Sequence, residues 1–270
     1  MTAKRCLHHP SHQADIMQSS NNNPAPPHQD PITQQQQSTT AQNLKAKDFI
    51  EFALAAGVLR FGEFKTKAGR LSPYFFNAGL FHDGQRLGEL ARFYAHKLQE
   101  ASRTGAIHYD MLFGPAYKGI TLAACTAVAL AQAGQNMHFA YNRKEAKDHG
   151  EGGVIVGAAL SGRVLIIDDV ISAGTSVGES VALIKSQGAE VAGVLIALDR
   201  QERSGTAEEI GTYSAVEDVQ QRYGVPVFAL ACLDDLIGYL EGREDAELSR
   251  WRAPLAAYRE RYGCTLARKS

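Results

Sequence analysis

The fold of this chain is decided by one stretch of sequence, Val164-Leu165-Ile166-Ile167-Asp168-Asp169-Val170-Ile171-Ser172-Ala173-Gly174-Thr175-Ser176. Four β-forming apolar residues end in two carboxylates, and a loop of small residues then begins a helix. A strand that passes through a short loop into a helix is the repeating unit of a parallel sheet covered by helices. Such sheets bind ligands at the carboxyl ends of their strands, so this loop marks a predicted binding site.

The second half of the stretch has the composition of an anion site. Backbone N–H groups around Gly174 and the hydroxyls of Ser172, Thr175 and Ser176 are donors, and the helix N-terminus adds positive potential. One phosphate monoester fits there. The carboxylates of Asp168 and Asp169 would repel a phosphate but suit the two vicinal hydroxyls of a ribose. The pattern therefore predicts a ribose 5-phosphate site, and the alternative is a capped turn beside a solvated Asp pair.

Strands and helices alternate through the rest of the chain, which predicts an α/β fold with a mostly parallel central sheet flanked by helices. Predicted strands cover residues 111–113, 138–141, 164–167, 191–198 and 227–231. Predicted helices cover residues from about 120 to 133, 176 to 186 and 207 to 223. Before them we expect helices near 49–56 and 87–98 and a strand pair, 61–64 and 72–76, joined by a turn at 67–70.

Composition excludes several classes of protein. The 270 residues include 28 Lys and Arg and 29 Asp and Glu, so the net charge is -1 and we expect no overall positive electrostatic field that would attract nucleic acid. No apolar run reaches the roughly 18 residues that span a bilayer, so we expect no membrane segment. The 4 cysteines form no CxxC pair, and the chain has no P-loop and no GxGxxG motif after a strand. Free thiols in a chain of this size favour the cytoplasm.

The first 43 residues differ from the remainder. They hold no Gly and no aromatic residue, but 5 of the 9 prolines and runs of Asn and Gln. Such a segment buries too little apolar area to offset its ordering entropy, so we expect a disordered tail over 1–43. Residues 44–270 are then a single domain, with a small N-terminal hood at about 44–80 and a C-terminal helix.

The stretch 164–176 resembles the phosphoribosyl pyrophosphate signature of type I phosphoribosyltransferases. Four more segments narrow the resemblance to the orotate phosphoribosyltransferases: a hood at Phe61–Asn77, a pyrophosphate loop at Gly114–Gly119, a flexible catalytic loop at Asn142–Gly153 and a base-site strand end at Asp199–Arg203. The resemblance extends from about Leu44 to Tyr262. It implies the type I phosphoribosyltransferase fold.

Two of these segments also have a physical interpretation of their own. Arg143, Lys144, Lys147 and His149 lie within seven residues and precede three glycines, which suits a mobile basic lid over a polyanion. Arg200 can pair bidentately with a carboxylate, which orotate has and uracil lacks. The alternatives are a solvated basic loop and a surface ion pair.

The resemblance implies a role for each residue of the site. Ligands of phosphoribosyl pyrophosphate are Lys67, Tyr117, Lys118, Arg143, Lys144, Lys147, His149, Asp168, Asp169, Val170, Ile171, Ser172, Ala173, Gly174, Thr175 and Ser176. Ligands of orotate are Phe75, Phe76, Ser172 and Arg200. Lys147, Asp168 and Asp169 are the implied catalytic residues. The resemblance also implies a cis peptide bond between Ala116 and Tyr117. Ser172 departs from the family, which more often has Thr at this position.

The implied reaction joins orotate to the ribose 5-phosphate of phosphoribosyl pyrophosphate and gives orotidine 5′-phosphate and pyrophosphate. Mg²⁺ would bridge substrate oxygens and keep most of its waters, so we name no metal site in the protein. The family also implies a homodimer whose basic loop reaches the partner's active site. The alternatives are a phosphoribosyltransferase for another base and a regulator that senses phosphoribosyl pyrophosphate without chemistry.

Overall fold

The structure is a computed structural model, and it describes residues 45–147, 153–172 and 174–264. The predicted tail at 1–43 lies outside this range, as do His149 and Ala173 of the predicted site. Lys147 is described by its backbone alone. Of the helices in the described ranges, none combines the length and the apolar character that crossing a bilayer requires.

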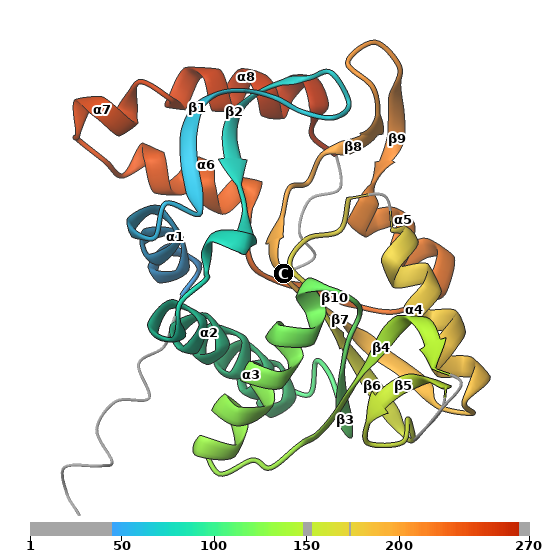
Figure 1. The fold of residues 1–270 in the computed structure, drawn as a ribbon. Helices are drawn as coiled ribbons and strands as arrows, with labels where there is room; N and C mark the ends of the chain where they lie inside the picture. The colour runs from blue at the N-terminus through green and yellow to red at the C-terminus, as the bar shows by residue number, and fades with distance from the viewer. Residues whose placement is uncertain (1–44, 148–152, 173, 265–270) are drawn as a thin grey trace, which may run out of the picture. The chain divides into compact units, whose positions relative to one another are not determined.

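A six-stranded sheet forms the centre of the described chain (Figure 1). In spatial order its strands are β10 (Val227–Cys232), β7 (Glu190–Asp199), β6 (Arg163–Ile167), β3 (Met111–Gly114), β4 (His138–Lys147) and β5 (Gly153–Gly157). All neighbours pair in parallel except β4 and β5, which are antiparallel. The predicted, mostly parallel sheet is confirmed, and β5 is an edge strand that was not among the predicted strands.

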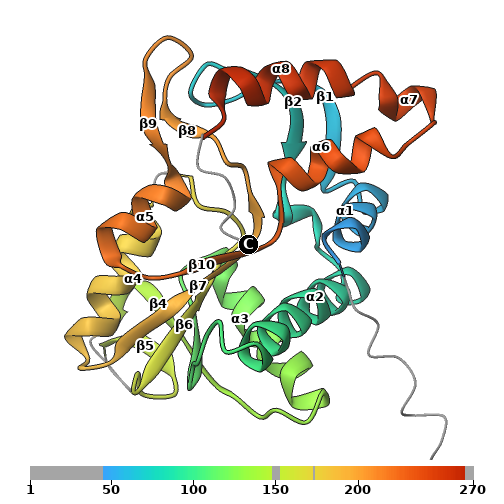
Figure 2. The same ribbon diagram turned by 180° about the vertical axis from the view of Figure 1, so that it is seen from behind.

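Helices cover both faces of this sheet (Figures 1 and 2). One face packs against α2 (Gly84–Arg103) and α3 (Lys118–Gln132), and the other against α4 (Thr175–Ser186) and α5 (Ala215–Tyr223). Alternate residues of β6 serve the two faces: Leu165 belongs to one core cluster and Ile166 to the other, and both are fully buried. This two-residue period is that of a strand buried on both sides.

The hood combines both ends of the described chain. Its N-terminal part is α1 (Ala46–Ala55), the hairpin of β1 (Leu59–Lys65) and β2 (Leu71–Phe76), and the short helix η2 (Ala78–Leu80). Its C-terminal part is α6 (Leu233–Glu241), α7 (Ala246–Ser249) and α8 (Arg252–Tyr262). The rings of Tyr74 on β2 and Tyr258 on α8 meet edge to face at 6.3 Å. The predicted hairpin is confirmed, whereas the predicted C-terminal helix is three helices.

The predicted helix over 207–223 is wrong in its first half. Residues from 203 to 214 form a hairpin of β8 (Arg203–Gly205) and β9 (Ile210–Ser214), and α5 begins only at Ala215. Ser214 and Glu217 make the reciprocal capping box that fixes this start. The buried guanidinium of Arg70 donates to backbone carbonyls of residues 203–206, which holds the hairpin through a contact remote in sequence.

Candidate active site

Asp168 and Asp169 directly follow β6, so they lie at the carboxyl edge of the sheet. Asp169 is 6% exposed, and its amide donates to Oδ1 of Asp168 at 2.8 Å. Beneath them Oη of Tyr94, a buried residue of α2, donates to the main-chain carbonyl of Asp168 at 2.8 Å. The position of the acidic pair is therefore fixed by the strand and by a helix under it.

The two carboxylates have different surroundings. Nζ of Lys118 lies 2.5 Å from Oδ2 of Asp169 and pairs with it. Burial raises the pKa of Asp168 to about 7, and the charge of Asp169 raises it in the same direction. Asp169 is therefore paired with the ammonium of Lys118, whereas Asp168 changes its protonation state near neutral pH.

Lys118 comes from the loop that was predicted to hold pyrophosphate. β3 ends at Gly114, α3 begins at Lys118, and the peptide bond between Ala116 and Tyr117 is cis, as the resemblance implies. A Cβ on Gly114 would lie 2.0 Å from the carbonyl oxygen of Gly119, so this turn closes only with glycine. The backbone at Gly114 therefore packs directly against Gly119 in the first turn of α3.

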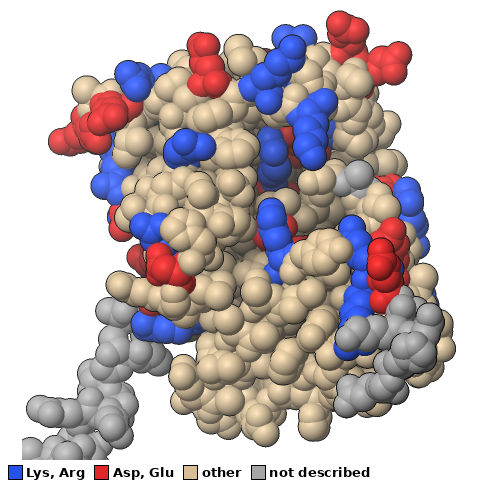
Figure 3. All heavy atoms as spheres, viewed as in Figure 1, with Lys and Arg blue, Asp and Glu red and all other residues tan. Residues whose placement is uncertain are grey.

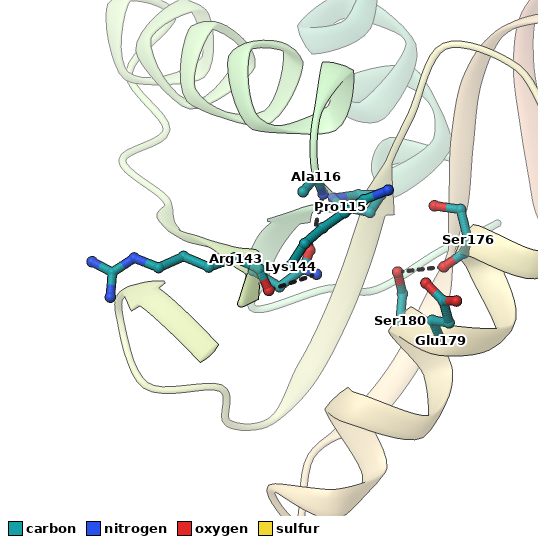
Figure 4. A pocket seen from close by; sticks show the side chains of 8 residues that line it. Pro115, Ala116, Arg143, Lys144, Ser176, Glu179 and Ser180 are labelled. Atoms are coloured by element: carbon teal, nitrogen blue, oxygen red, sulfur yellow. Dashed lines mark hydrogen bonds between the residues drawn. The ribbon is translucent and has the colours of Figure 1, made fainter. Parts of the chain in front are cut away.

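A cavity of about 330 Å³ lies beside this loop (Figure 4). Its lining comes from the pyrophosphate loop, β4 and α4: Pro115, Ala116, Asn142, Arg143, Lys144, Ser176, Glu179 and Ser180. Oδ1 of Asn142 accepts a hydrogen bond from the amide of Ala116 at 2.9 Å, which ties β4 to the loop. The ammonium of Lys144 lies 5.2 Å from the ring centroid of Tyr117, whereas the guanidinium of Arg143 points away from the other labelled side chains (Figure 4).

The predicted catalytic loop is shorter than the sequence suggested. Strand β4 continues through Arg143 and Lys144 to Lys147, and β5 begins at Gly153, so only residues 148–152 separate the two strands. Two of the predicted pyrophosphate ligands, Arg143 and Lys144, therefore lie on a strand. The side chain of Lys147 lies outside the described part.

The predicted phosphate loop joins β6 to α4. Ile171 and Val177 are buried and anchor its two sides, and Val170 is partly buried. Gly174 has a φ of 72° and occupies the N-terminal cap of α4, a conformation that glycine adopts without strain. The hydroxyl residues of this loop are all exposed: Ser172, Thr175 and Ser176. The geometry presents hydroxyls and a helix N-terminus to solvent, as an anion site requires.

The predicted base site combines the hood with the end of β7. Phe75 is 38% exposed, and its ring lies 5.3 Å from that of Phe64, whereas the ring of Phe76 packs toward Phe49 of α1. Arg200 follows β7 and is 32% exposed. Lys67 is exposed in the turn between β1 and β2. Figure 3 shows Lys and Arg side chains gathered over the middle of the molecular face that Figure 1 presents, with Asp and Glu mainly toward its edges.

Sequence reasoning missed several residues that support the site. Tyr94 fixes Asp168, Asn142 fixes the pyrophosphate loop, and Glu202 binds Arg200. Glu202 stands in the quoted base-site segment, but nothing in the sequence distinguishes it from a solvated glutamate. Tyr94 lies on the apolar side of a helix, where its spacing predicts only a core residue.

Comparison with known proteins gives the chain its relatives. The family model described as phosphoribosyl transferase domain matches residues 81–221. An orotate phosphoribosyltransferase of Cupriavidus necator is 64% identical over 218 residues, which cover 81% of this chain and 94% of the relative. One of Polynucleobacter asymbioticus is 61% identical over 83% of this chain and 99% of the relative.

A solved structure agrees with these sequences. The crystal structure of orotate phosphoribosyltransferase from Francisella tularensis is 41% identical to this chain and superposes with a TM-score of 0.69. The superposition covers 80% of this chain and 98% of the Francisella tularensis chain. Both the fold and the sequence motifs therefore lead to one assignment, and the chain belongs to the phosphoribosyltransferase family and, within it, to the orotate phosphoribosyltransferases.

Proposed function

We infer that the chain transfers ribose 5-phosphate from phosphoribosyl pyrophosphate to orotate, giving orotidine 5′-phosphate and pyrophosphate in pyrimidine biosynthesis. The observation that carries this inference is the acidic pair Asp168–Asp169 at the end of β6, followed by the glycine-capped helix α4. This arrangement offers carboxylates to a ribose diol and helix amides to its 5-phosphate. The relatives named above supply the base, orotate.

In the reaction, a ring nitrogen of orotate forms a bond to C1′ of the ribose and releases its proton to solvent, while the C1′–O bond to pyrophosphate breaks. The electron pair of that bond leaves with pyrophosphate, and positive charge develops on the ribose ring. Asp168 and Asp169 would hold the ribose hydroxyls and stabilise that charge. Positioning and electrostatics supply most of such catalysis, because the protein forms no covalent intermediate here.

We propose that the cations around the cavity neutralise the leaving pyrophosphate. Lys118 starts α3, and Lys144 lies on β4 and lines the cavity beside the same loop, so both would lie near the oxygens that gain charge. Lys118 pairs with Asp169 in the free protein, and substrate phosphate would compete for its ammonium. Lys147 and His149, together with Arg143, complete the proposed set, and Lys147 is expected to have the largest effect.

We propose that orotate lies between the hood and the end of β7. The exposed ring of Phe75 and the backbone of Phe76 would bound the planar base, and Arg200 would bind its carboxylate bidentately. Lys67, in the exposed turn between β1 and β2 of the hood, would contact the pyrophosphate or the base.

Mg²⁺ belongs to this proposal as a companion of the substrate. In the described ranges no group of three or more His, Cys, Asp or Glu side chains is placed to hold a metal ion. Two carboxylates, one of them paired with Lys118, fit an ion held mainly by substrate oxygens and water. When bound, the ion would offset phosphate charge.

A homodimer in the cytoplasm completes the proposal. Arg143 lines the cavity, but its guanidinium points away from the other labelled side chains, and this direction supports a basic segment that serves a neighbouring subunit (Figure 4). The alternative function, transfer to another base, requires a ligand without a carboxylate opposite Arg200. An enzyme for such a base would gain nothing from a guanidinium at this position.

A panel of bases tests the function. With phosphoribosyl pyrophosphate and Mg²⁺ present, release of pyrophosphate should depend on orotate. Uracil, adenine and hypoxanthine should give rates lower by about 10³-fold or more, since a site built for a carboxylate is left unpaired without it. Equal rates with another base would select the alternative enzyme. Binding of phosphoribosyl pyrophosphate without turnover of any base would select the regulator.

A further inference from the structure

Glu202 lies at the centre of a side-chain cluster that joins the hood to the end of β7. Its Oε1 atom accepts hydrogen bonds from Oη of Tyr74 at 2.9 Å and from Nε and Nη2 of Arg200 at 3.0 and 2.9 Å. Its Oε2 atom lies 4.0 Å from Nη1 of Arg70. The Glu202 side chain is 13% exposed, so these charges interact where water screens them weakly.

These contacts hold Arg200 by one edge and place it over an aromatic ring. Nε and Nη2 form the side edge of the guanidinium, and both donate to the same oxygen of Glu202. Cζ of Arg200 lies over the ring of Tyr74, 5.4 Å from the ring centroid. Within the described ranges Nη1 makes no hydrogen bond, so the end edge, Nη1 with Nη2, can receive a second carboxylate, which accepts both donors in the planar fork geometry.

The charge of the cluster also matches a carboxylate ligand. Arg70 and Arg200 flank the single carboxylate of Glu202, so the three side chains carry one net positive charge. Arg70 is 3% exposed, and its N–H groups donate hydrogen bonds to backbone carbonyls of residues 203–206. The side chain of Arg200 is the more exposed of the two, at 32%. A monoanionic ligand that reaches Arg200 would neutralise the cluster.

The backbone holds Arg200 and Glu202 in a fixed relation. Gln201 between them has a φ of 49°, an uncommon conformation for a residue other than glycine. Its amide donates to Oδ1 of Asp199 at 2.9 Å. Its side chain donates to Oδ2 of Asp234 at 3.0 Å and accepts from the Asp234 amide at 2.8 Å. Backbone conformations of this kind persist where the surroundings enforce them, and they concentrate at functional sites.

We propose that Glu202 is a positioning residue that sets the specificity for a carboxylate-bearing base. It orients Arg200 so that the end edge of the guanidinium meets the orotate carboxylate, and Tyr74 ties this orientation to the hood. The proposal rests on the proposed function, because it takes Arg200 as the ligand of that carboxylate. Glu202 itself touches neither substrate.

Kinetics of Glu202→Gln test the proposal. The change keeps the size of the side chain and removes its charge, so kcat/KM for orotate should fall about tenfold as Arg200 loses its fixed orientation. KM for phosphoribosyl pyrophosphate and the inhibition constant of uracil, which has no carboxylate, should stay at the wild-type values. Tyr74→Phe keeps the ring under Arg200 and removes one donor to Glu202, so it should give a smaller loss of the same kind. Glu208→Gln, an exposed glutamate of the same hairpin, is the matched control and should change nothing.

A double-mutant cycle with Arg200→Ala separates the possible failures. The account predicts that Arg200→Ala abolishes the preference for orotate and that adding Glu202→Gln then has no further effect. The proposal is overturned if Glu202→Gln weakens uracil binding as much as it lowers kcat/KM for orotate, or if it leaves kcat/KM for orotate unchanged. It is also overturned if Glu202→Gln lowers kcat/KM for orotate by the same factor in the Arg200→Ala background. If Arg200→Ala itself keeps wild-type kcat/KM for orotate, the base site of the proposed function is wrong. Melting temperatures show whether each variant is folded, and Tyr74→Phe serves as the test if Glu202→Gln is not.

Discussion

At the scale of single residues, Asp168 combines its proposed role in binding ribose with a cost in stability. Its carboxyl is buried beside a second carboxylate, and its raised pKa expresses that cost. The folded state binds this proton more tightly than the unfolded state, whose pKa is 3.8. The contribution of this bound proton to the free energy of unfolding is therefore complete below about pH 3.8, and it is lost as pH rises toward 7. Above pH 7 the ionised Asp168 lowers the free energy of unfolding.

Asp168→Asn should therefore stabilise the free protein at pH 8 while it removes ribose binding. We expect a gain of about 1 kcal/mol or more, which corresponds to roughly 2 to 4 °C in a protein of this size. The gain should shrink between pH 8 and pH 5. Calorimetry without substrate and Mg²⁺ measures it, and an equal shift at both pH values would show that the carboxyl titrates normally.

Ser172 offers a second prediction at this scale. The residue is exposed in the loop after β6, so the extra methyl of Ser172→Thr should meet solvent and leave kcat/KM within about twofold. Ser172→Ala removes the hydroxyl and should raise KM for the substrates about three- to tenfold, since one hydrogen bond is worth about 1 kcal/mol. Steady-state kinetics of both variants decide the matter, and identical behaviour of the two would mean that the hydroxyl binds nothing.

At the scale of elements, the sequence predicted the sheet well because each buried strand is a continuous apolar run with its own flanking loop. It failed for the hairpin of residues 203–214, since the contact that holds it comes from Arg70, more than a hundred residues earlier. It made no prediction for β5, whose residues follow the glycines of the predicted catalytic loop and pair antiparallel with β4. The loops after β3 and β6 were predictable, whereas the bounds of the catalytic loop and the supporting residues Tyr94 and Glu202 were not.

The pyrophosphate loop yields a prediction at this scale. Gly114→Ala would bring a Cβ to 2.0 Å from the Gly119 carbonyl, and backbone cannot yield as a flexible side chain does. We expect a loss of about 2 kcal/mol or more of unfolding free energy, together with lower activity.

Gly88→Ala is the matched control for this substitution. Gly88 is exposed in α2, and no described residue outside its own helical turn would lie within 4 Å of a Cβ there, so Ala should stabilise the helix by up to about 1 kcal/mol. Thermal unfolding of the two variants measures both effects. A Gly114→Ala protein as stable as the wild type would show that the turn can open without cost.

At the scale of the whole molecule, the proposed dimer predicts complementation between inactive variants. Lys147→Ala and Asp168→Ala homodimers should both be inactive. If Lys147 serves the partner's site, one site of each mixed dimer receives both defects and the other receives none. Random exchange should then restore about a quarter of wild-type activity. A mixture that stays inactive after verified subunit exchange would place Lys147 in the site of its own subunit.

The central claim is that the acidic pair at the end of β6 binds the ribose of phosphoribosyl pyrophosphate during transfer to orotate. The most direct measurement is orotate consumption by the wild type and by Asp168→Asn/Asp169→Asn, each with phosphoribosyl pyrophosphate and Mg²⁺. The account predicts one orotate consumed for each pyrophosphate released by the wild type, and a double variant that remains folded but loses about 10³-fold or more of kcat/KM. A wild type that consumes no orotate, or a folded double variant with wild-type turnover, would contradict it.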